Sequence, residues 1–262
     1  MEWSIITAVN NDELLANNLL RSPEVSQAKE VLLQKGFSSA AKAYNSGIDK
    51  SNAEILVFVH QDVYLPSGWL DCLKKALAHL STHDPKWGVL GVRGVSRDAR
   101  FHGHIYCTGN KRILGEPFTK PERILMLDEV LLVVRKSSGL RFDEQLPGFH
   151  FYGTDICLES NGQNLQSYVI PAFCIHNTNG YESMPTEFWR SYSFIRKKWA
   201  FQLPIRTPCI EVSHFPLTIP WARFRRWWWI AVKGYRVGHR VPDPVKLYSE
   251  VTSRFCMANK CL

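Results

Sequence analysis

Stretches of apolar and polar residues alternate along the first half of the chain, as strands and helices do in α/β proteins. Trp3 to Val9 and Glu54 to Val59 are nearly continuous β-rich runs, and the second has the composition of a strand buried on both faces of a sheet. A helical pattern follows the first run at Glu13 to Leu20. Another starts after Pro66-Ser67-Gly68, where we expect Ser67 to cap the helix. This alternation predicts a mostly parallel sheet flanked by helices.

The same pattern continues to about residue 180. Leu125 to Val134 reads as a strand interrupted by two acidic residues, and Ser167 to Ile170 reads as a shorter strand. Between them we expect a helix that starts near Thr154, its capping residue, with Asp155 in the first turn. We assign residues 1–180 to one α/β domain.

Charge divides the chain at the same place. Residues 1–180 hold 18 Lys and Arg against 19 Asp and Glu, a net charge of −1, whereas residues 181–262 hold 14 against 5, a net charge of +9. The two parts sum to the net charge of +8 for all 262 residues. We therefore expect a separate, basic and helical C-terminal extension over residues 181–262.

Composition excludes several classes of protein. A chain with 45% hydrophobic residues can bury a full core, which excludes disordered and fibrous proteins. No run reaches the roughly 18 uncharged apolar residues of a membrane span, and no basic segment precedes an apolar one at the start. We expect neither secretion nor a transmembrane helix. The seven cysteines are scattered without a CxxC pair, which favours reduced thiols in the cytoplasm over zinc or disulfides.

Candidate chemistry begins where the strand at Glu54 to Val59 ends. His60-Gln61-Asp62 follows it directly, and in sheets of this kind ligands bind beyond the carboxyl ends of the strands. A carboxylate there can hold Mg²⁺ or Mn²⁺. Asp62 is therefore a candidate metal ligand, and a solvated turn residue is the alternative. His60 either contacts a bound ligand or packs at the strand end.

Taken in order, these motifs resemble those of GT-A glycosyltransferases of family two. The resemblance covers about residues 1–180 and rests on the strand at Trp3 to Asn10, Ala43-Tyr-Asn-Ser-Gly-Ile48, Ile55-Leu-Val-Phe-Val-His-Gln-Asp62, Arg141-Phe-Asp-Glu144, Gly153-Thr-Asp155 and His176. A subgroup of the family carries His-Gln-Asp in place of the DxD motif. The resemblance implies a Rossmann-like GT-A fold whose strand-end motif binds a divalent metal and the diphosphate of a nucleotide sugar. It also implies a later Asp as base and a downstream His as metal ligand.

The resemblance assigns roles to individual residues. His60 would contact the nucleotide, and the metal would neutralise charge that develops on the departing nucleoside diphosphate. His176 would complete the metal shell with Asp62, since manganese accepts imidazole; a core or capping histidine is the alternative. Asp155 would be the general base, or else only a favourable charge at a helix start. Asp128-Glu129 could be an acceptor-site pair or a strand end without chemistry, and we assign it no catalytic role. Polar residues near the strand ends would line the nucleotide pocket or merely form turns and caps: Asn10, Asp12 and Asn45.

Aromatic and basic residues are interleaved in the C-terminal extension. Arg223 to Ile230 contains three consecutive tryptophans, and an earlier helical pattern contains Phe188, Trp189, Tyr192, Ile195 and Trp199. Such segments suit an anionic membrane surface or a lipid-linked acceptor, and they suit equally a cover for the protein's own core or a partner subunit. No RNA- or DNA-binding motif accompanies the charge, so we expect no nucleic-acid partner.

The predicted function is transfer of a sugar from a nucleotide sugar, with a UDP donor, to a saccharide or lipid-linked acceptor. We expect inversion at the anomeric carbon, because the sequence offers one base and one metal site but no further residue with the signature of a nucleophile. We expect a cytoplasmic protein, peripheral on the membrane if the extension binds lipid. The rival prediction is a catalytically weakened GT-A domain that acts as a binding or adaptor module at a membrane surface, because His60 replaces the first Asp of the motif.

Overall fold

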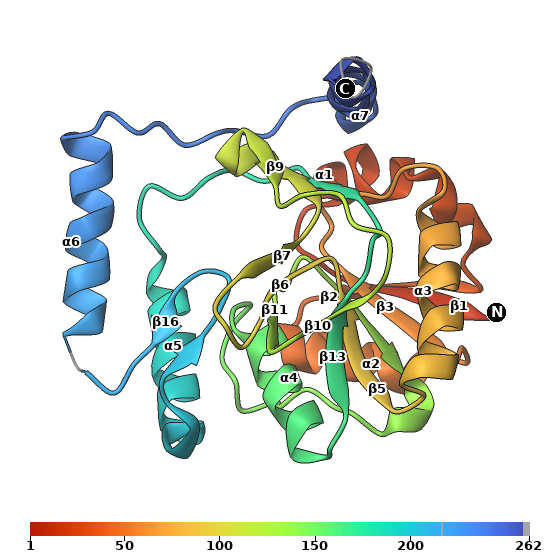
Figure 1. The fold of residues 1–262 in the computed structure, drawn as a ribbon, viewed down its shortest axis with the longest axis horizontal. Coiled ribbons are helices and arrows are strands. Elements are labelled where there is room, and N and C mark those ends of the chain that lie inside the picture. The colour runs from red at the N-terminus through yellow and green to blue at the C-terminus, as the bar shows by residue number, and fades with distance from the viewer. Residues whose placement is uncertain (216, 259–262) are drawn as a thin grey trace.

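A seven-stranded sheet forms the centre of the computed structural model, which describes residues 1–215 and 217–258 (Figure 1). In order across the sheet, its strands are β10 (Glu122–Ile124), β13 (Gln166–Val169), β5 (Trp87–Gly91), β12 (Leu131–Arg135), β3 (Ile55–Val59), β1 (Trp3–Val9) and β2 (Glu30–Lys35). β2, β1, β3, β5 and β13 run in one direction, and β12 and β10 run in the other. The predicted mostly parallel α/β sheet is confirmed.

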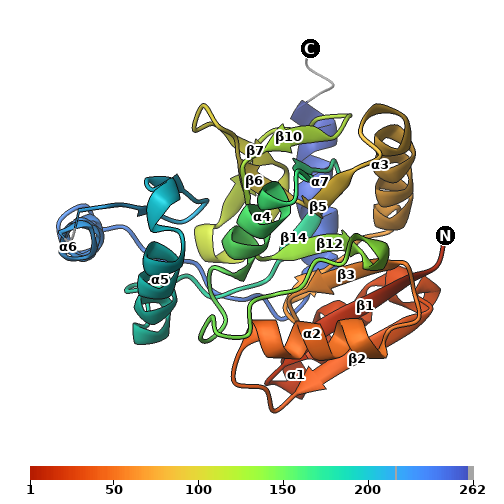
Figure 2. The same ribbon diagram turned by 90° about the horizontal axis from the view of Figure 1, so that it is seen from below.

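Helices cover both faces of this sheet (Figure 2). α2 (Ala40–Lys50), α4 (Tyr152–Gly162) and α5 (Thr186–Lys198) pack on one face, and α1 (Asp12–Asn17) and α3 (Trp69–His83) pack on the other. Two more helices, α6 (Thr218–Ala231) and α7 (Pro244–Ala258), come later in the chain. Neighbouring residues of a strand point to opposite faces, so Phe58 packs with α2, α4 and α5 in one apolar core while Val57 packs with α1 and α3 in another. The two cores hold β3 in the middle of the fold.

Smaller sheets extend the carboxyl edge of the main sheet. Their strands are β4 (Val63–Tyr64), β6 (Arg93–Val95), β7 (Phe101–Gly103), β8 (Ile105–Cys107), β9 (Arg112–Leu114), β11 (Met126–Leu127), β14 (Cys174–His176), β15 (Ile205–Arg206) and β16 (Glu211–Val212). β14 lies between β4 and β8, and β4 follows β3 after a short turn. This arrangement brings the end of β14 to the turn that follows β3.

Two helices start at residues other than those expected. We expected Ser67 to cap the helix that follows it, but the N-cap of α3 is Gly68, whose φ of 86° is a conformation that glycine adopts without strain. The other helix, α4, begins at Tyr152, after Phe151 with a φ of 66°, so Thr154 lies inside the first turn and is not the cap. In both cases a left-handed residue directs the chain into the helix without a side-chain cap. Asp155 lies in the first turn, as predicted.

The chain after residue 180 contains a packed part and an exposed part. Phe188, Tyr192 and Ile195 of α5 are buried in the same core as α2 and α4, so this aromatic face covers the protein's own core. α6 stands to one side of the fold, where Trp221 is 61% and Trp227 58% exposed (Figures 1 and 2). The predicted domain boundary at residue 180 stays a prediction.

The cysteines and the helices bear on two further expectations. The cysteines with described side chains are free thiols: Cys72, Cys107, Cys157, Cys174 and Cys209. Cys261 and the side chain of Cys256 lie outside the described residues. Within the described chain, no helix combines the length and the apolar character that crossing a membrane requires.

Candidate metal centre and donor site

Three side chains that can bind a metal come together at the carboxyl end of β3. His60 and Asp62 belong to the turn between β3 and β4, and His176 is the last residue of β14. β14 pairs with β4 so that His176 lies opposite Val63, which brings its imidazole to Asp62. His176 Nε2 is 3.4 Å and His60 Nδ1 is 4.0 Å from Asp62 Oδ1. The three ligand atoms all lie within 4.8 Å of one another.

The charges in this cluster depend on one another. Burial alone would raise the pKa of Asp62, but the charges of His176, His60 and Arg240 hold that pKa well below its usual range. Burial lowers the pKa of His176, but the charge of Asp62 and the hydrogen bond with it outweigh burial and raise that pKa to about 10. Without an ion His176 is therefore protonated at neutral pH, and it would release that proton on binding a metal. Burial and the charge of His176 together lower the pKa of His60 to about 4. At neutral pH His60 is therefore a neutral imidazole, the form that binds metals.

Tyr152 fixes the orientation of His60. The Tyr152 hydroxyl donates a hydrogen bond of 2.8 Å to the carbonyl oxygen of Glu129 and lies 2.7 Å from His60 Nε2. Because the hydroxyl hydrogen already forms the hydrogen bond to Glu129 O, Nε2 of His60 carries the ring proton and donates a hydrogen bond to the hydroxyl oxygen. Nδ1 of His60 is then an unprotonated nitrogen that faces Asp62. Metal-binding histidines commonly have one nitrogen held by a protein group in this way while the other faces the ion.

The donor set fits a divalent cation. Two imidazole nitrogens with one carboxylate oxygen suit Mn²⁺ better than Mg²⁺, which prefers oxygen ligands. Arg240 Nη2 lies 3.2 Å from Oδ2 of Asp62, which leaves Oδ1 on the side of the two histidines. His60 Nδ1, Asp62 Oδ1 and His176 Nε2 are the atoms that would hold an ion here.

The end of β1 is tied to the His-Gln-Asp turn. Gln61 Oε1 accepts hydrogen bonds from the backbone N–H groups of Asn10 and Asn11, at 3.2 and 3.1 Å. Asn11 also caps α1, because its side chain accepts a hydrogen bond from Leu14 N. Asp12, in the first turn of α1, forms an exposed ion pair with Lys35 at 2.5 Å. Asn10 therefore lies beside the metal-ligand cluster, whereas Asp12 points its carboxylate to the end of β2.

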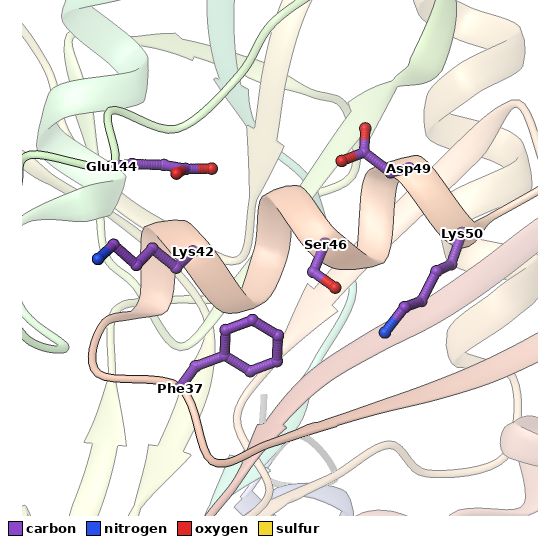
Figure 3. A pocket seen from close by; sticks show the side chains of 6 residues that line it. All are labelled: Phe37, Lys42, Ser46, Asp49, Lys50 and Glu144. Carbon is purple, nitrogen blue, oxygen red and sulfur yellow. The ribbon is translucent and has the colours of Figure 1, made fainter.

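Asn45 has a structural partner for its side-chain amide. Its Nδ2 donates to Phe142 O at 2.9 Å and to Glu144 Oε1 at 3.0 Å, and its Oδ1 accepts from Phe142 N. These bonds join α2 to the loop at residues 142–144. Next to them, a cavity of about 350 Å³ on the outside of α2 is lined by Phe37, Lys42, Ser46, Asp49, Lys50 and Glu144 (Figure 3). None of its lining residues belongs to the metal-ligand cluster.

A larger cavity of about 1040 Å³ reaches from the metal-ligand cluster to α6. His176 and Asp128 belong to its lining. Aromatic and arginine side chains from α5, α6 and the segment after α6 also line it: Trp189, Arg223, Arg225, Arg226, Trp227, Trp229 and Tyr235. Aromatic rings offer flat apolar surfaces, and guanidinium groups bind carboxylates and phosphates. The cavity can therefore accept a ligand that combines apolar faces with anionic groups.

Asp155 lies in a closed ion cluster and is not part of the lining of this cavity. Its side chain is 2% exposed; Lys198 Nζ is 2.9 Å from Oδ1, and Trp199 Nε1 donates to Oδ1 at 2.7 Å. Lys198 also contacts Asp143 and Glu159, at 2.7 and 2.8 Å. Burial raises the pKa of Asp155 despite these partners. Lys198 and Trp199 would have to move before Asp155 could take a proton from an acceptor.

Asp128 lines the larger cavity, whereas Asp155 does not. Its Oδ2 lies 3.5 Å from Arg93 Nη1, and its Oδ1 accepts a hydrogen bond from Glu129 N at 2.7 Å. The adjacent Glu129 is half-buried, and burial followed by the charge of Asp128 raises the pKa of its carboxyl group well above the usual range. Of this acidic pair only Asp128 lines the cavity.

Sequence reasoning missed three residues of the centre. Tyr152 stands immediately before the Gly153-Thr-Asp155 motif, so the sequence pointed to this segment but not to the hydrogen bond between Tyr152 and His60. Cys107 lies opposite His176 in the pairing of β14 with β8. Burial raises the pKa of the Cys107 thiol, but the hydrogen bond with His176 and the charge of His176 lower that pKa overall. Arg240 is 178 positions from Asp62 in the sequence, and no local pattern relates the two.

Comparisons with known proteins bear on the fold and the family. A model of the Glycosyltransferase like family matches residues 4–193. The structure of GalNAc-T7 with UDP, GalNAc and Mn²⁺ has a TM-score of 0.53 at 9% sequence identity, over 77% of this chain and 49% of that chain. This likeness confirms the GT-A-like fold. S. aureus TarS has a TM-score of 0.47 at 13% identity, over 76% of this chain and 39% of that one.

One curated relative is similar in sequence. The Fuscovulum blasticum protein "ATP synthase subunits region ORF 6" is 30% identical over 139 residues, which cover 50% of this chain and 53% of the relative. The chain thus matches about half the length of this relative and of GalNAc-T7.

Proposed function

Because this chain belongs to the Glycosyltransferase like family, we propose that it transfers a sugar from a nucleotide-sugar donor to a saccharide acceptor. The observation that carries the proposal is the cluster of His60, Asp62 and His176 at the carboxyl end of β3, beside an open cavity. Ligands bind at that edge in α/β sheets. GalNAc-T7, which shares the fold, was determined with UDP, GalNAc and Mn²⁺, and this supports a UDP-sugar donor and Mn²⁺.

The cluster would hold a divalent cation, which supplies positive charge where a nucleoside diphosphate departs. Asp62 would contribute a carboxylate that is charged at neutral pH, and His60 a neutral imidazole oriented by Tyr152. Asn10 and His60 would also border the nucleotide, because both lie at the strand ends that carry the cluster. Contacts of Asp12 and Asn45 with the nucleotide stay predictions, and their ion pair and amide bonds give each a structural role as well.

An inverting transfer needs a carboxylate that takes the acceptor proton on the side opposite the departing diphosphate. The sequence analysis predicts Asp155 as this base; Asp155 lies in the first turn of α4 and is enclosed by Lys198 and Trp199. Asp128 is the second candidate, because its carboxylate lines the cavity. Asp128→Asn and Asp155→Asn distinguish the two: the base variant loses transfer by about a hundredfold or more and keeps donor affinity. Inversion itself is tested by NMR of the first-formed product.

The acceptor would lie in the larger cavity, between the metal-ligand cluster and the extension over residues 181–262. Trp189, Trp227 and the arginines of α6 support a saccharide or lipid-linked acceptor with anionic groups. Exposed Trp221 and Phe224, outside the lining of the cavity, support contact with an anionic membrane surface. A cytoplasmic location and peripheral membrane attachment are tested by cell fractionation with and without a salt wash.

Isothermal calorimetry with a panel of nucleotide sugars, with and without Mn²⁺, tests the donor site. We expect one donor to bind in a Mn²⁺-dependent manner, and Asp62→Ala to abolish that dependence with the melting temperature little changed. Asp71→Ala is the matched control, because Asp71 is an exposed carboxylate on α3. Unchanged Mn²⁺-dependent binding by Asp62→Ala would remove Asp62 from the site.

The rival function is a catalytically weakened module that binds a ligand or partner. It shares the donor site, so binding alone does not separate the two. Slow hydrolysis of the bound donor in the presence of Mn²⁺ is expected of the enzyme, because water can replace the acceptor. A protein that binds the donor and leaves it intact through long incubation with candidate acceptors would favour the binding module.

A further inference from the structure

The chain returns to the metal-ligand cluster after α6, in a segment at residues 237–241 that we call the strap. The strap lies beyond residues 4–193, the part that the family model matches. Its backbone is bonded to two loops of the main fold: Gly238 N donates to Gly109 O at 2.8 Å, and Gly180 N donates to Gly238 O at 2.9 Å. Val241 N donates to Asn177 Oδ1 at 2.8 Å. The strap is therefore attached at both ends.

The strap packs tightly against the backbone of the main fold at Gly238. A Cβ atom on Gly238 would lie 1.8 Å from the carbonyl oxygen of Thr108, so only glycine allows this approach. Asn177 completes the attachment, because its Nδ2 donates to Val241 O at 2.8 Å and to Asn18 Oδ1 at 2.7 Å. Asn177 directly follows His176, so the strap and the metal-ligand cluster share the end of β14.

Arg240 extends from the strap to the metal-ligand cluster. Its Nη2 lies 3.2 Å from Asp62 Oδ2, its Nε donates to Asn177 O at 3.2 Å, and its backbone N donates to Asn179 Oδ1 at 3.0 Å. Nη1 makes no hydrogen bond with any described residue. The side chain is 38% exposed, whereas that of Asp62 is 9% exposed. The guanidinium thus bonds a buried carboxylate through Nη2 and keeps Nη1 available for a further acceptor.

We infer that Arg240 binds the diphosphate of the nucleotide sugar, as a second cation beside the metal-ligand cluster; this inference rests on the proposed function. Asp62 presents Oδ1 to the two histidines and Oδ2 to Arg240, so the guanidinium and a cation held on Oδ1 would flank the same carboxylate and would both be placed to bind a diphosphate. Nε and one N–H of Nη2 are already bonded, and Nη1 together with the second N–H of Nη2 can donate to phosphate oxygens. Asn177 and Asn179 hold the arginine in place before the donor arrives, which limits the entropy lost on binding.

The test compares a nucleoside diphosphate with its nucleoside. Calorimetry in Mn²⁺ first identifies which of UDP, GDP, CDP and dTDP the wild-type protein binds most tightly. We expect Arg240→Gln to weaken binding of that diphosphate by about 10- to 100-fold and to leave binding of the matching nucleoside unchanged. Arg236→Gln is the matched control, since Arg236 is an exposed arginine directly before the strap. Arg240→Lys keeps the charge without the fork, so its affinity falls between wild type and Arg240→Gln.

Three results would overturn the inference. If Arg240→Gln binds the diphosphate with wild-type affinity, the arginine only forms an ion pair with Asp62. If the affinity of Arg240→Gln is higher, the arginine only competes with the cation for Asp62. An equal loss for diphosphate and nucleoside, without rescue by Arg240→Lys, would show that it only shapes the pocket. Failure of the wild-type protein to bind any of the four diphosphates is a different outcome, because it overturns the proposed function itself.

Discussion

Replacing Tyr152 by Phe removes a single oxygen atom from the core and releases His60 from its support. In the wild-type protein that oxygen accepts from His60 Nε2 at 2.7 Å, and the hydroxyl donates to Glu129 O at 2.8 Å. The variant leaves both groups without this partner, and a buried polar group without a partner costs about 1–3 kcal/mol. Loss of the group that orients a metal-binding histidine lowers metal affinity by about 10- to 100-fold. That change corresponds to about 1.4–2.8 kcal/mol of binding free energy.

Calorimetric titration with Mn²⁺ measures this loss, and thermal unfolding of the metal-free variant measures the accompanying change in stability. Tyr44→Phe is the matched control: Tyr44 is buried in the same core, and its hydroxyl lies 3.4 Å from that of Tyr152 without contacting His60. Tyr44→Phe should keep the wild-type Mn²⁺ affinity. If Tyr152→Phe also binds Mn²⁺ as the wild type does, while its melting temperature falls, then the hydroxyl supports only the fold and our account of His60 is wrong.

Three further predictions concern the rest of the molecule. Lys198→Met should lower the free energy of unfolding by about 3–5 kcal/mol, because it leaves the buried carboxylate of Asp155 without its cation, whereas exposed Lys197→Met should change it by less than about 0.5 kcal/mol; chemical denaturation measures both. Because Asp128 lines the cavity and Asp155 does not, Asp128→Asn should lower transfer by about a hundredfold or more with donor affinity retained; if only Asp155→Asn does so in a transfer assay, the sequence-based choice of base is the right one. Trp221→Ser should reduce co-sedimentation with phosphatidylserine vesicles by about tenfold, and equal co-sedimentation would remove the membrane role of α6.

The sequence predicted best where a local pattern reports burial directly. The run at Ile55–Val59 is apolar at every position because β3 lies between two cores, and the polar turn after it can only lie at the edge of the sheet. The helix at α4 was expected, but its start was misplaced by two residues. A capping side chain is a visible signal, whereas the left-handed Phe151 that begins this helix depends on its packing against Phe188.

The aromatic extension shows why a periodic pattern leaves its role open. The residues of α5 and α6 share tryptophans and arginines, yet Phe188 and Tyr192 are buried in the core while Trp221 and Trp227 are exposed. Helical periodicity identifies an apolar face and does not identify what the face contacts. The choice between core and open surface depends on which element lies next to the helix, and that is a property of the whole fold.

Net charge along the sequence likewise did not reveal what each charged residue contacts. A net charge of +9 after residue 180 suggested a basic surface for a membrane or an acceptor, but one of those arginines reaches Asp62 through a strap seated on Gly109 and Asn177. The strap can pack there only because residue 238 is glycine, since the carbonyl oxygen of Thr108 occupies the place of a Cβ atom. The sequence alone gives no sign of this contact. A truncation that removed the extension to test membrane binding would therefore also remove the contact of Arg240 with Asp62. For this reason single substitutions on α6, which leave the strap in place, are the variants that can separate the two roles.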